Sequence, residues 1–204
     1  MDLRSLGTSQ LDAMREVANI GAGHAATALS QMTNHVIMID VPEVSILRLE
    51  EVDRILGEPD EVVAAVMMKV LGDMTGRTLQ VFPGPSAVKL TAMLLGGPEP
   101  TFPEGFGEAH QSTLKEIGNI IVGAYLNALS DFMGLLLIMS VPAIAIDMAG
   151  AVMTTSYLNF GETRDFVFCV NTIMTMDGAE IRAHFLLIPD DTSLGVMLRE
   201  MKLA

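Results

Sequence analysis

Hydrophobic residues recur at helical spacing in two long segments of the chain. Successive residues of an ideal helix turn by about 100°, so the apolar positions of each segment fall on one stripe. The first stripe is Leu11, Met14, Ala18, Gly21, Ala25, Leu29 and Met32, and the second is Leu114, Ile117, Ile121, Tyr125, Leu129 and Phe132. We predict two long helices whose stripes pack inward, with the larger side chains of the second filling the space that the small residues of the first leave open.

Two further segments have the pattern of antiparallel hairpins. Residues 61–82 and 165–188 each hold two apolar runs, separated by the polar turns MTGR and MDGAE, as is typical of a hairpin. A proline and small polar residues follow each hairpin, and apolar residues then return at helical spacing. Ser86 and Asp191 are the N-caps that this pattern predicts. Each half of the chain therefore predicts a long helix, a strand, a variable segment, a hairpin and a second helix.

An internal repeat relates the two halves at an offset of one hundred residues. Unrelated sequences would share about two positions over the aligned length, so the agreement indicates a duplication. Residues 11–42 align with residues 111–142 without a gap and share nine identities, which are Glu16/Glu116, Asn19/Asn119, Ile20/Ile120, Gly23/Gly123, Ala28/Ala128, Leu29/Leu129, Ser30/Ser130, Val41/Val141 and Pro42/Pro142.

The repeat predicts an α+β fold built as a pseudo-twofold tandem duplication of an α-β-x-β-β-α unit, with antiparallel sheet and two long helices. Each unit has an amphipathic hairpin and a helix stripe to cover, so we expect a single domain over residues 1–204. The first repeat spans about 8–95 and the second about 108–202, joined by the Gly/Pro-rich connector 96–107. The uncharged segment 132–146 is too short to span a membrane and is predicted to be buried core.

Composition limits the classes of partner and the location. Twelve Lys and Arg against 25 Asp and Glu give a formal charge of -13, which disfavours nucleic acid and anionic lipid surfaces. The single Cys169 cannot form an internal disulfide, and the first residues lack the apolar region of a signal peptide. We therefore expect a cytoplasmic protein without membrane insertion. The four histidines are scattered without partners at ligand spacing, so no metal or cofactor bound by this chain is expected.

Polar residues recur on the side of each long helix opposite its apolar stripe. Asp12, Glu16 and Asn19 lie on one side of the first helix, and Ser112, Glu116 and Asn119 take the same positions on the second. Glu and Asn are common on solvated helix surfaces, so a single pair would be structural background. Asn has a lower helix propensity than Ala, Lys or Gln, and yet it recurs in both copies with a proline 23 residues later. This recurrence favours a function outside the helix.

The pattern Asp/Ser-x-x-x-Glu-x-x-Asn, followed by 22 residues and a proline, resembles the CheC, CheX and FliY phosphatases. The chain matches it twice, from Asp12 to Pro42 and from Ser112 to Pro142, and two intact motifs resemble CheC more than CheX. The resemblance implies a chemotaxis phosphatase that hydrolyses the aspartyl phosphate of phosphorylated CheY, with Mg²⁺ on the CheY substrate. It also implies a heterodimer with the regulator CheD.

The same resemblance implies a role for each motif residue. Asn19 and Asn119 would orient the attacking water, because a carboxamide both accepts and donates hydrogen bonds. Glu16 and Glu116 would dock to a lysine of the regulator, since a bare carboxylate would repel a phosphoryl group. The remaining motif positions, which are Asp12, Ser112, Pro42 and Pro142, would support the two pairs.

The sequence leaves two alternatives to catalysis on CheY. A non-catalytic binding module would resemble the middle domain of the flagellar switch protein FliM, which lacks the Glu/Asn pair. A small-molecule enzyme is disfavoured because the pairs lie on convex helix faces. Asp147 is the only charge between Phe132 and Gly161. It either makes a local hydrogen bond at a strand end or marks residues 147–158 as a surface for CheD. We expect a monomer, because the duplication supplies an internal twofold partner.

Overall fold

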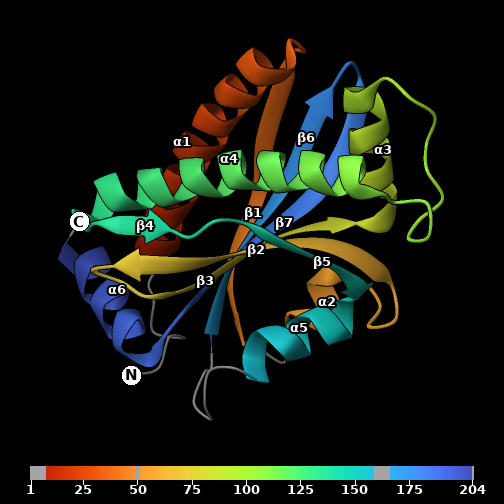
Figure 1. The fold of residues 1–204 in the computed structure, drawn as a ribbon. Coiled ribbons are helices and arrows are strands. Elements are labelled where there is room, and N and C mark those ends of the chain that lie inside the picture. The colour runs from red at the N-terminus through yellow and green to blue at the C-terminus, as the bar shows by residue number, and fades with distance from the viewer. Residues whose placement is uncertain (1–7, 49–50, 159–165, 204) are drawn as a thin grey trace.

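The structure is a computed structural model that describes residues 8–48, 51–158 and 166–203 (Figure 1). The first repeat contains α1 (Thr8–Thr33), β1 (Ile37–Arg48), α2 (Asp53–Leu56), β2 (Val62–Gly72), β3 (Gly76–Pro83) and α3 (Gly84–Leu95). The second repeat contains α4 (Glu108–Met133), β4 (Leu137–Met139), β5 (Ala143–Met148), α5 (Ala149–Leu158), β6 (Phe166–Met176), β7 (Ala179–Pro189) and α6 (Asp191–Leu203). The predicted order of elements is confirmed, and the short helices α2 and α5 occupy the variable segments. Residue 165, the predicted start of the second hairpin, lies outside the described residues.

The described strands form one seven-stranded sheet with the order β1-β6-β7-β3-β2-β4, in which β5 also pairs with β2. Every pairing is antiparallel. In the second repeat, β6 and β7 correspond to β2 and β3, and β4 with β5 corresponds to β1. Replacing each strand by its counterpart gives the same order read backwards, so the pseudo-twofold axis passes between β3 and β7. The edge strands are exchanged, because β1 of the first repeat pairs with β6 of the second, while β4 and β5 of the second pair with β2 of the first. The tandem duplication is confirmed.

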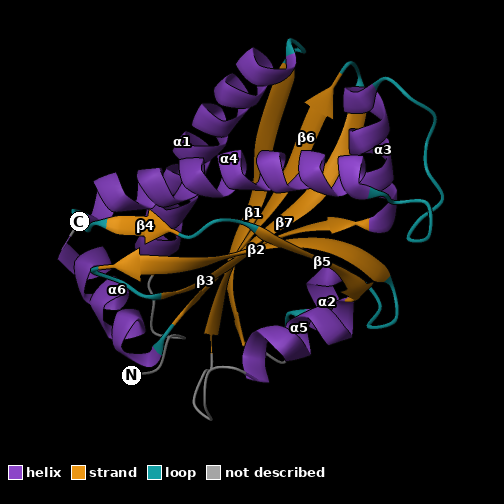
Figure 2. Ribbon diagram, in the orientation of Figure 1, coloured by secondary structure: helices purple, strands orange, loops and turns teal. Residues whose placement is uncertain are grey.

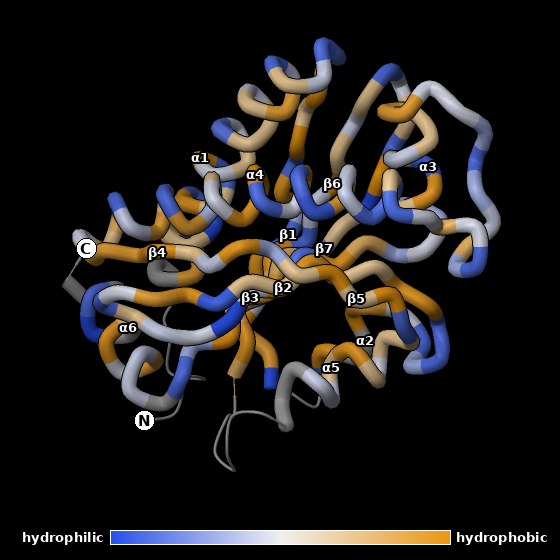
Figure 3. The backbone as a smooth tube through the Cα atoms, viewed as in Figure 1, coloured by the Kyte–Doolittle hydropathy of each residue, from blue (hydrophilic) through white to orange (hydrophobic). Residues whose placement is uncertain are grey.

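Helices pack on both faces of the sheet, and each face has its own hydrophobic core. Helices α1 and α4 lie across one face, whereas α2 and α5 lie against part of the other (Figure 2). Side chains of a strand alternate between faces, so Ala64 belongs to the core under α1 and α4 and its neighbour Val63 to the core under α2 and α5. The central strands are therefore apolar along most of their length, as the hydropathy colouring in Figure 3 shows.

The two long helices cross in close contact, as predicted from the complementary sizes of their side chains. A Cβ atom added at Gly21 would lie 2.7 Å from the ring of Tyr125, so only glycine permits this approach. Tyr125 in turn stacks on Phe185 with ring centroids 4.9 Å apart. One stripe residue was predicted wrongly: Met32 is 45 % exposed. It lies in the last turn of α1, far along the helix from the crossing.

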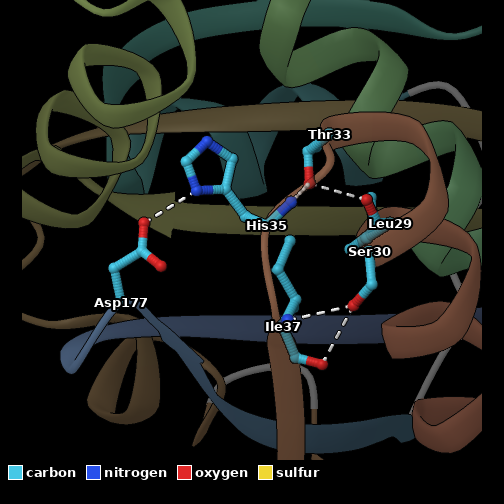
Figure 4. Close-up of polar contacts among 6 residues, drawn as sticks. All are labelled: Leu29, Ser30, Thr33, His35, Ile37 and Asp177. Carbon is cyan, nitrogen blue, oxygen red and sulfur yellow. Dashed lines mark hydrogen bonds and ion pairs between the residues drawn. The ribbon is translucent and has the colours of Figure 1, made fainter.

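The repeated serine, Ser30 in the first copy and Ser130 in the second, has a structural role at the end of each long helix. Ser30 Oγ accepts a hydrogen bond from the Ile37 N–H at 2.9 Å and donates to the Ile37 carbonyl, which ties the end of α1 to the start of β1 (Figure 4). Ser130 Oγ donates to the Leu135 carbonyl after α4. His35 Nδ1 also lies 2.7 Å from Asp177 Oδ2 of the β6–β7 turn. The end of α1 is thus anchored to both copies.

The predicted N-cap of α3 is wrong, and that of α6 is displaced by one residue. Ser86 lies inside the first turn of α3, and its Oγ accepts a hydrogen bond from the Arg182 N–H of β7 at 3.1 Å. At α6 the capping residue is Asp190, whose Oδ1 accepts from the Ser193 N–H at 2.8 Å. Burial disfavours its charge, but hydrogen bonds from Thr75, Ser193 and Thr192 outweigh this effect and lower the pKa of Asp190 to about 2.

The segment 132–146 is not the continuous buried core that its composition predicted. Leu137 is buried, but Leu136 and Ile138 on either side of it are exposed, and Val141 is 87 % exposed. The reason is that β4 is an edge strand with one face toward α4 and the other open, so alternate side chains meet solvent. No helix within the described ranges is long and apolar enough to cross a membrane.

Candidate functional site

Both predicted Glu/Asn pairs point away from the core. Glu16 and Asn19 are exposed on α1, and Glu116 is exposed on α4, where Asn119 is half-buried. The predicted outward orientation is confirmed. Asp12 and Ser112, one turn earlier, are also exposed. The residues between Glu and Asn are buried in both copies, and they are Val17, Ala18, Ile117 and Gly118. Each helix turn is therefore held by its inner side while its outer side carries the pair.

A glycine seats the second motif helix closely on the sheet. A Cβ atom added at Gly118 would lie 2.9 Å from Cβ and Cγ1 of Val66 on β2. The corresponding position in α1 is Ala18, which is buried but does have a Cβ. The missing side chain at Gly118 lets α4 approach β2, and this contact fixes the turn that carries Glu116 and Asn119.

Both motif prolines lie where an edge strand contains one extra residue. On β1, Asp40 pairs with Ile173 and Glu43 with Asn171, so three steps along β1 match two along β6. Between β4 and β5, Met139 pairs with Val70 and Ala143 with Met67, so four steps match three along β2. Proline cannot donate to the ladder and is accommodated at edges and bulges. The structure thus gives Pro42 and Pro142 equivalent backbone positions, although β1 continues as one strand and its counterpart is divided.

The second motif borders a hollow that the sequence did not indicate. The hollow has a volume of about 430 Å³. Its walls come from both repeats, and the lining residues are Met32 and Thr33 of α1, Leu94 of α3, and Ser112, Thr113 and Glu116 of α4. The prediction that the pairs lie on plainly convex surfaces is therefore wrong for Glu116. Only the packing of α1 and α3 beside α4 creates this concavity, and no local spacing in the sequence reports it.

Two titratable residues outside the motifs, His184 and Cys169, have pKa values shifted by their burial in the fold. His184 Nδ1 lies 2.8 Å from Asn171 Oδ1, and burial, together with the charge of Arg182, lowers the pKa of His184 to about 4. Burial, with a contribution from Glu43, raises the pKa of the Cys169 thiol to about 12, so this thiol stays protonated. In the part of the chain that the structure describes, no group of three or more His, Cys, Asp or Glu could hold a metal ion.

Asp147 makes the local hydrogen bond that was one of its two predicted roles. Its Oδ1 accepts from the Met148 N–H at 2.8 Å, near the end of β5. Asp147 is nevertheless exposed, as is the apolar side chain of Met148. The role of this exposed surface in binding a partner stays a prediction.

Comparison with known proteins identifies the family. The CheC-like family model matches residues 10–46 and 110–146, which are the two motif segments. The CheY-P phosphatase CheC of Bacillus subtilis is 36 % identical over 185 residues, which cover 89 % of this chain and 88 % of that protein. The chain belongs to the CheC-like family.

Solved structures agree on the fold. FliY of Thermotoga maritima matches with a TM-score of 0.76 at 21 % identity, covering 97 % of this chain and 98 % of that one. The middle domain of FliM from H. pylori matches with a TM-score of 0.67 at 12 % identity, covering 96 % and 99 %. Because a phosphatase family and a flagellar switch protein share this architecture, the fold alone does not decide between catalysis and binding. The residues displayed on it must do so.

Proposed function

We propose that this protein hydrolyses the aspartyl phosphate of phosphorylated CheY and so terminates a chemotaxis signal. The observation that carries the proposal is the outward display of a Glu/Asn pair at equivalent places on α1 and α4. Membership of the CheC-like family and the 36 % identity to a CheY-P phosphatase support it. A FliM-like binding module would have no use for two such pairs.

Asn19 and Asn119 are the residues that we assign to the attacking water. Phosphoryl transfer requires a water in line with the bond to be broken and positive charge around the phosphoryl oxygens. The carboxamide oxygen accepts a hydrogen bond from the water, and the NH₂ group donates one, so the side chain orients the water without acting as a base. The water oxygen bonds to phosphorus as the bond to the aspartyl oxygen breaks. The products are inorganic phosphate and a free aspartate, and Mg²⁺ on CheY supplies the positive charge.

Glu16 and Glu116 are assigned to docking on a lysine of CheY. A carboxylate beside a phosphoryl group is repelled unless a cation lies between them. Glu and Asn are three residues apart, so they lie on neighbouring positions of one helix turn, and the buried residues between them hold that turn in place. The pair can therefore enter the regulator's site as one rigid unit, which keeps the water and the docking contact at a fixed separation.

The exposed surface around Asp147 is assigned to CheD. The assignment rests on an exposed carboxylate beside the exposed side chain of Met148 at the end of an edge strand. The proposed surface continues into α5, whose residues Ala149, Val152 and Met153 are buried against the sheet and hold the helix in place. A charged residue framed by apolar ones on an anchored element is a suitable contact for a specific protein partner.

A double substitution tests the catalytic assignment. Asn19→Ala combined with Asn119→Ala should lower the rate of phosphate release from phosphorylated CheY by about 100-fold or more, because the water loses its orientation. Binding of CheY carrying a stable phosphoryl analogue, measured by calorimetry, should be retained because Glu16 and Glu116 remain. Asn127→Ala is the matched control, since Asn127 is exposed on α4 outside the motif. Undiminished turnover in the double variant would refute the assignment, and binding without turnover in the parent protein would favour a binding module.

A further inference from the structure

The hollow beside Glu116 combines one carboxylate with two apolar side chains from other helices. Glu116 is exposed on α4, Met32 lies in the last turn of α1, and Leu94 lies near the end of α3. The hydroxyl-bearing residues Thr33, Ser112 and Thr113 complete the lining. We propose that Met32 and Leu94 are specificity-determining residues of the second site, which hold the methylene stem of the lysine that Glu116 binds. This inference rests on the proposed function and extends it to residues outside the motif.

The composition of the hollow selects among possible occupants. An acidic side chain would be repelled by Glu116, and a purely apolar one would leave the carboxylate without a partner. A lysine side chain has a four-carbon apolar stem that ends in a compact ammonium. The stem can lie against Met32 and Leu94 while the ammonium reaches Glu116, which lines the same hollow. The flexible thioether of Met32 adapts to such a stem.

The wall that Met32 contributes is held in place before any partner arrives. Ser30, just before Met32, makes two hydrogen bonds with Ile37, and His35, just after the end of α1, lies with its Nδ1 2.7 Å from Asp177 Oδ2 (Figure 4). Thr33 Oγ1 donates to the Leu29 carbonyl at 2.8 Å, which further fixes the helix end. Met32 itself stays 45 % exposed, so its side chain is available for contact while its backbone is fixed.

The first site has different residues at the two equivalent positions. The repeat places Phe132 where the first copy has Met32. Alignment of residues 83–95 with residues 189–201 places Glu200 where the first copy has Leu94. Phe132 and Leu94 are both partly buried against the main core, so the clear difference is Glu200, which places a carboxylate where the second site has the apolar Leu94. The first site therefore keeps an apolar residue at one of the two positions and has a negative charge at the other, and apolar support on both sides of a lysine stem is specific to the second site.

Kinetics in a protein with one working site test the inference. In the Asn19→Ala background, which leaves only the second site, Met32→Gln should raise KM for phosphorylated CheY about fivefold and leave kcat within about twofold, because docking is weakened and water positioning is not. Met32→Leu should restore the parent KM. Met38→Gln is the control, since Met38 is 59 % exposed on β1 and its neighbours Ile37 and Ile39 face the core under α1.

The outcomes separate this inference from the proposed function. Phosphate release with an unchanged KM in the Met32→Gln protein overturns the inference and leaves the proposed function intact. An equal rise of KM in the Asn119→Ala background, where only the first site works, also overturns it, since the effect would then be global. Absence of phosphate release from the parent protein overturns both. Melting temperatures of Met32→Gln and Met38→Gln that agree with each other support a contact effect over a loss of folding.

Discussion

The two motif helices carry the same Glu/Asn pair in unlike surroundings. On α1 both residues of the pair are exposed, and the helix meets its neighbour through Gly21, against the ring of Tyr125. On α4 the Asn is half-buried, the helix lies closely on β2 through Gly118, and a hollow opens beside Glu116. Duplication preserved the chemical groups while the contacts around them diverged.

This difference shows that two copies of the same Glu/Asn motif can form two different sites, because the residues around each copy differ. The second site takes walls from other helices, and these are α1 and α3 of the first copy. A substitution in the first copy, at Met32 or Leu94, therefore changes the surroundings of the second copy's motif. The two sites can differ in affinity for the regulator although their reactive groups are identical.

The largest expected effect on stability concerns how closely each motif helix packs on its neighbours. Gly118→Ala should lower the free energy of unfolding by about 2 kcal/mol, because the new Cβ would overlap Val66. Gly23→Ala should instead raise it by about 0.5–1 kcal/mol, since Gly23 is an exposed helix residue with nothing within 4 Å of an added Cβ. Urea unfolding measures both. Equal effects at the two glycines would contradict the close seating of α4.

The next largest effect concerns the exposed edge strand β5, compared with an exposed position on α4. Asp147→Lys should weaken CheD binding about tenfold or more, because it reverses the only charge within residues 147–158. Asp131→Lys on α4 is the control of equal charge change at another exposed position. Calorimetric titration with purified CheD measures both variants. Unchanged affinity in a folded Asp147→Lys protein would remove this surface from consideration.

The single Asn variants sharpen the comparison of the two sites. Asn119→Ala should lower phosphate release at low CheY concentration about fivefold, and Asn19→Ala less than about twofold, if the apolar support beside Glu116 makes the second site the stronger. Phosphate release from labelled CheY measures both, beside Asn127→Ala. Equal losses would show that the different walls do not affect turnover.

The smallest expected effect is a loss of stability in acid that comes from the second hairpin alone. Of the two hairpins, only residues 165–188 contain a histidine. His184 is half-buried in β7 and has a pKa of about 4, below the ordinary value of 6.5. The unfolded chain therefore binds a proton that the folded chain does not, and stability is lost as pH falls from about 6.5 toward about 4. Lowering the pH from 7 to 6 should cost about 0.7 kcal/mol through this residue. Urea unfolding of His184→Gln, which lacks this group, should show a correspondingly smaller loss, and an identical loss would contradict the prediction.

Local spacing was enough to predict the elements and the outward display of both pairs. The order of helices and hairpins and the exposure of Glu16 and Asn19 follow from periodicities of a few residues. The exchange of edge strands could not be predicted, because nothing in β1 indicates that it pairs with β6 rather than with β2. The exposure of Met32 and the hollow at Glu116 were missed for the same reason, since each depends on which helices lie nearby in the folded molecule.

The exchange of edge strands also constrains how the chain can fold during synthesis. Ile37 pairs with Met176 and Arg48 with Phe166, so β1 must remain without its neighbour until most of the chain has left the ribosome. Pairings between residues so distant in sequence close late and slowly, and an unpaired edge is open to association with other chains in the meantime. The amino-terminal half should therefore depend on chaperones, or on rapid completion of translation, more than its size alone would suggest.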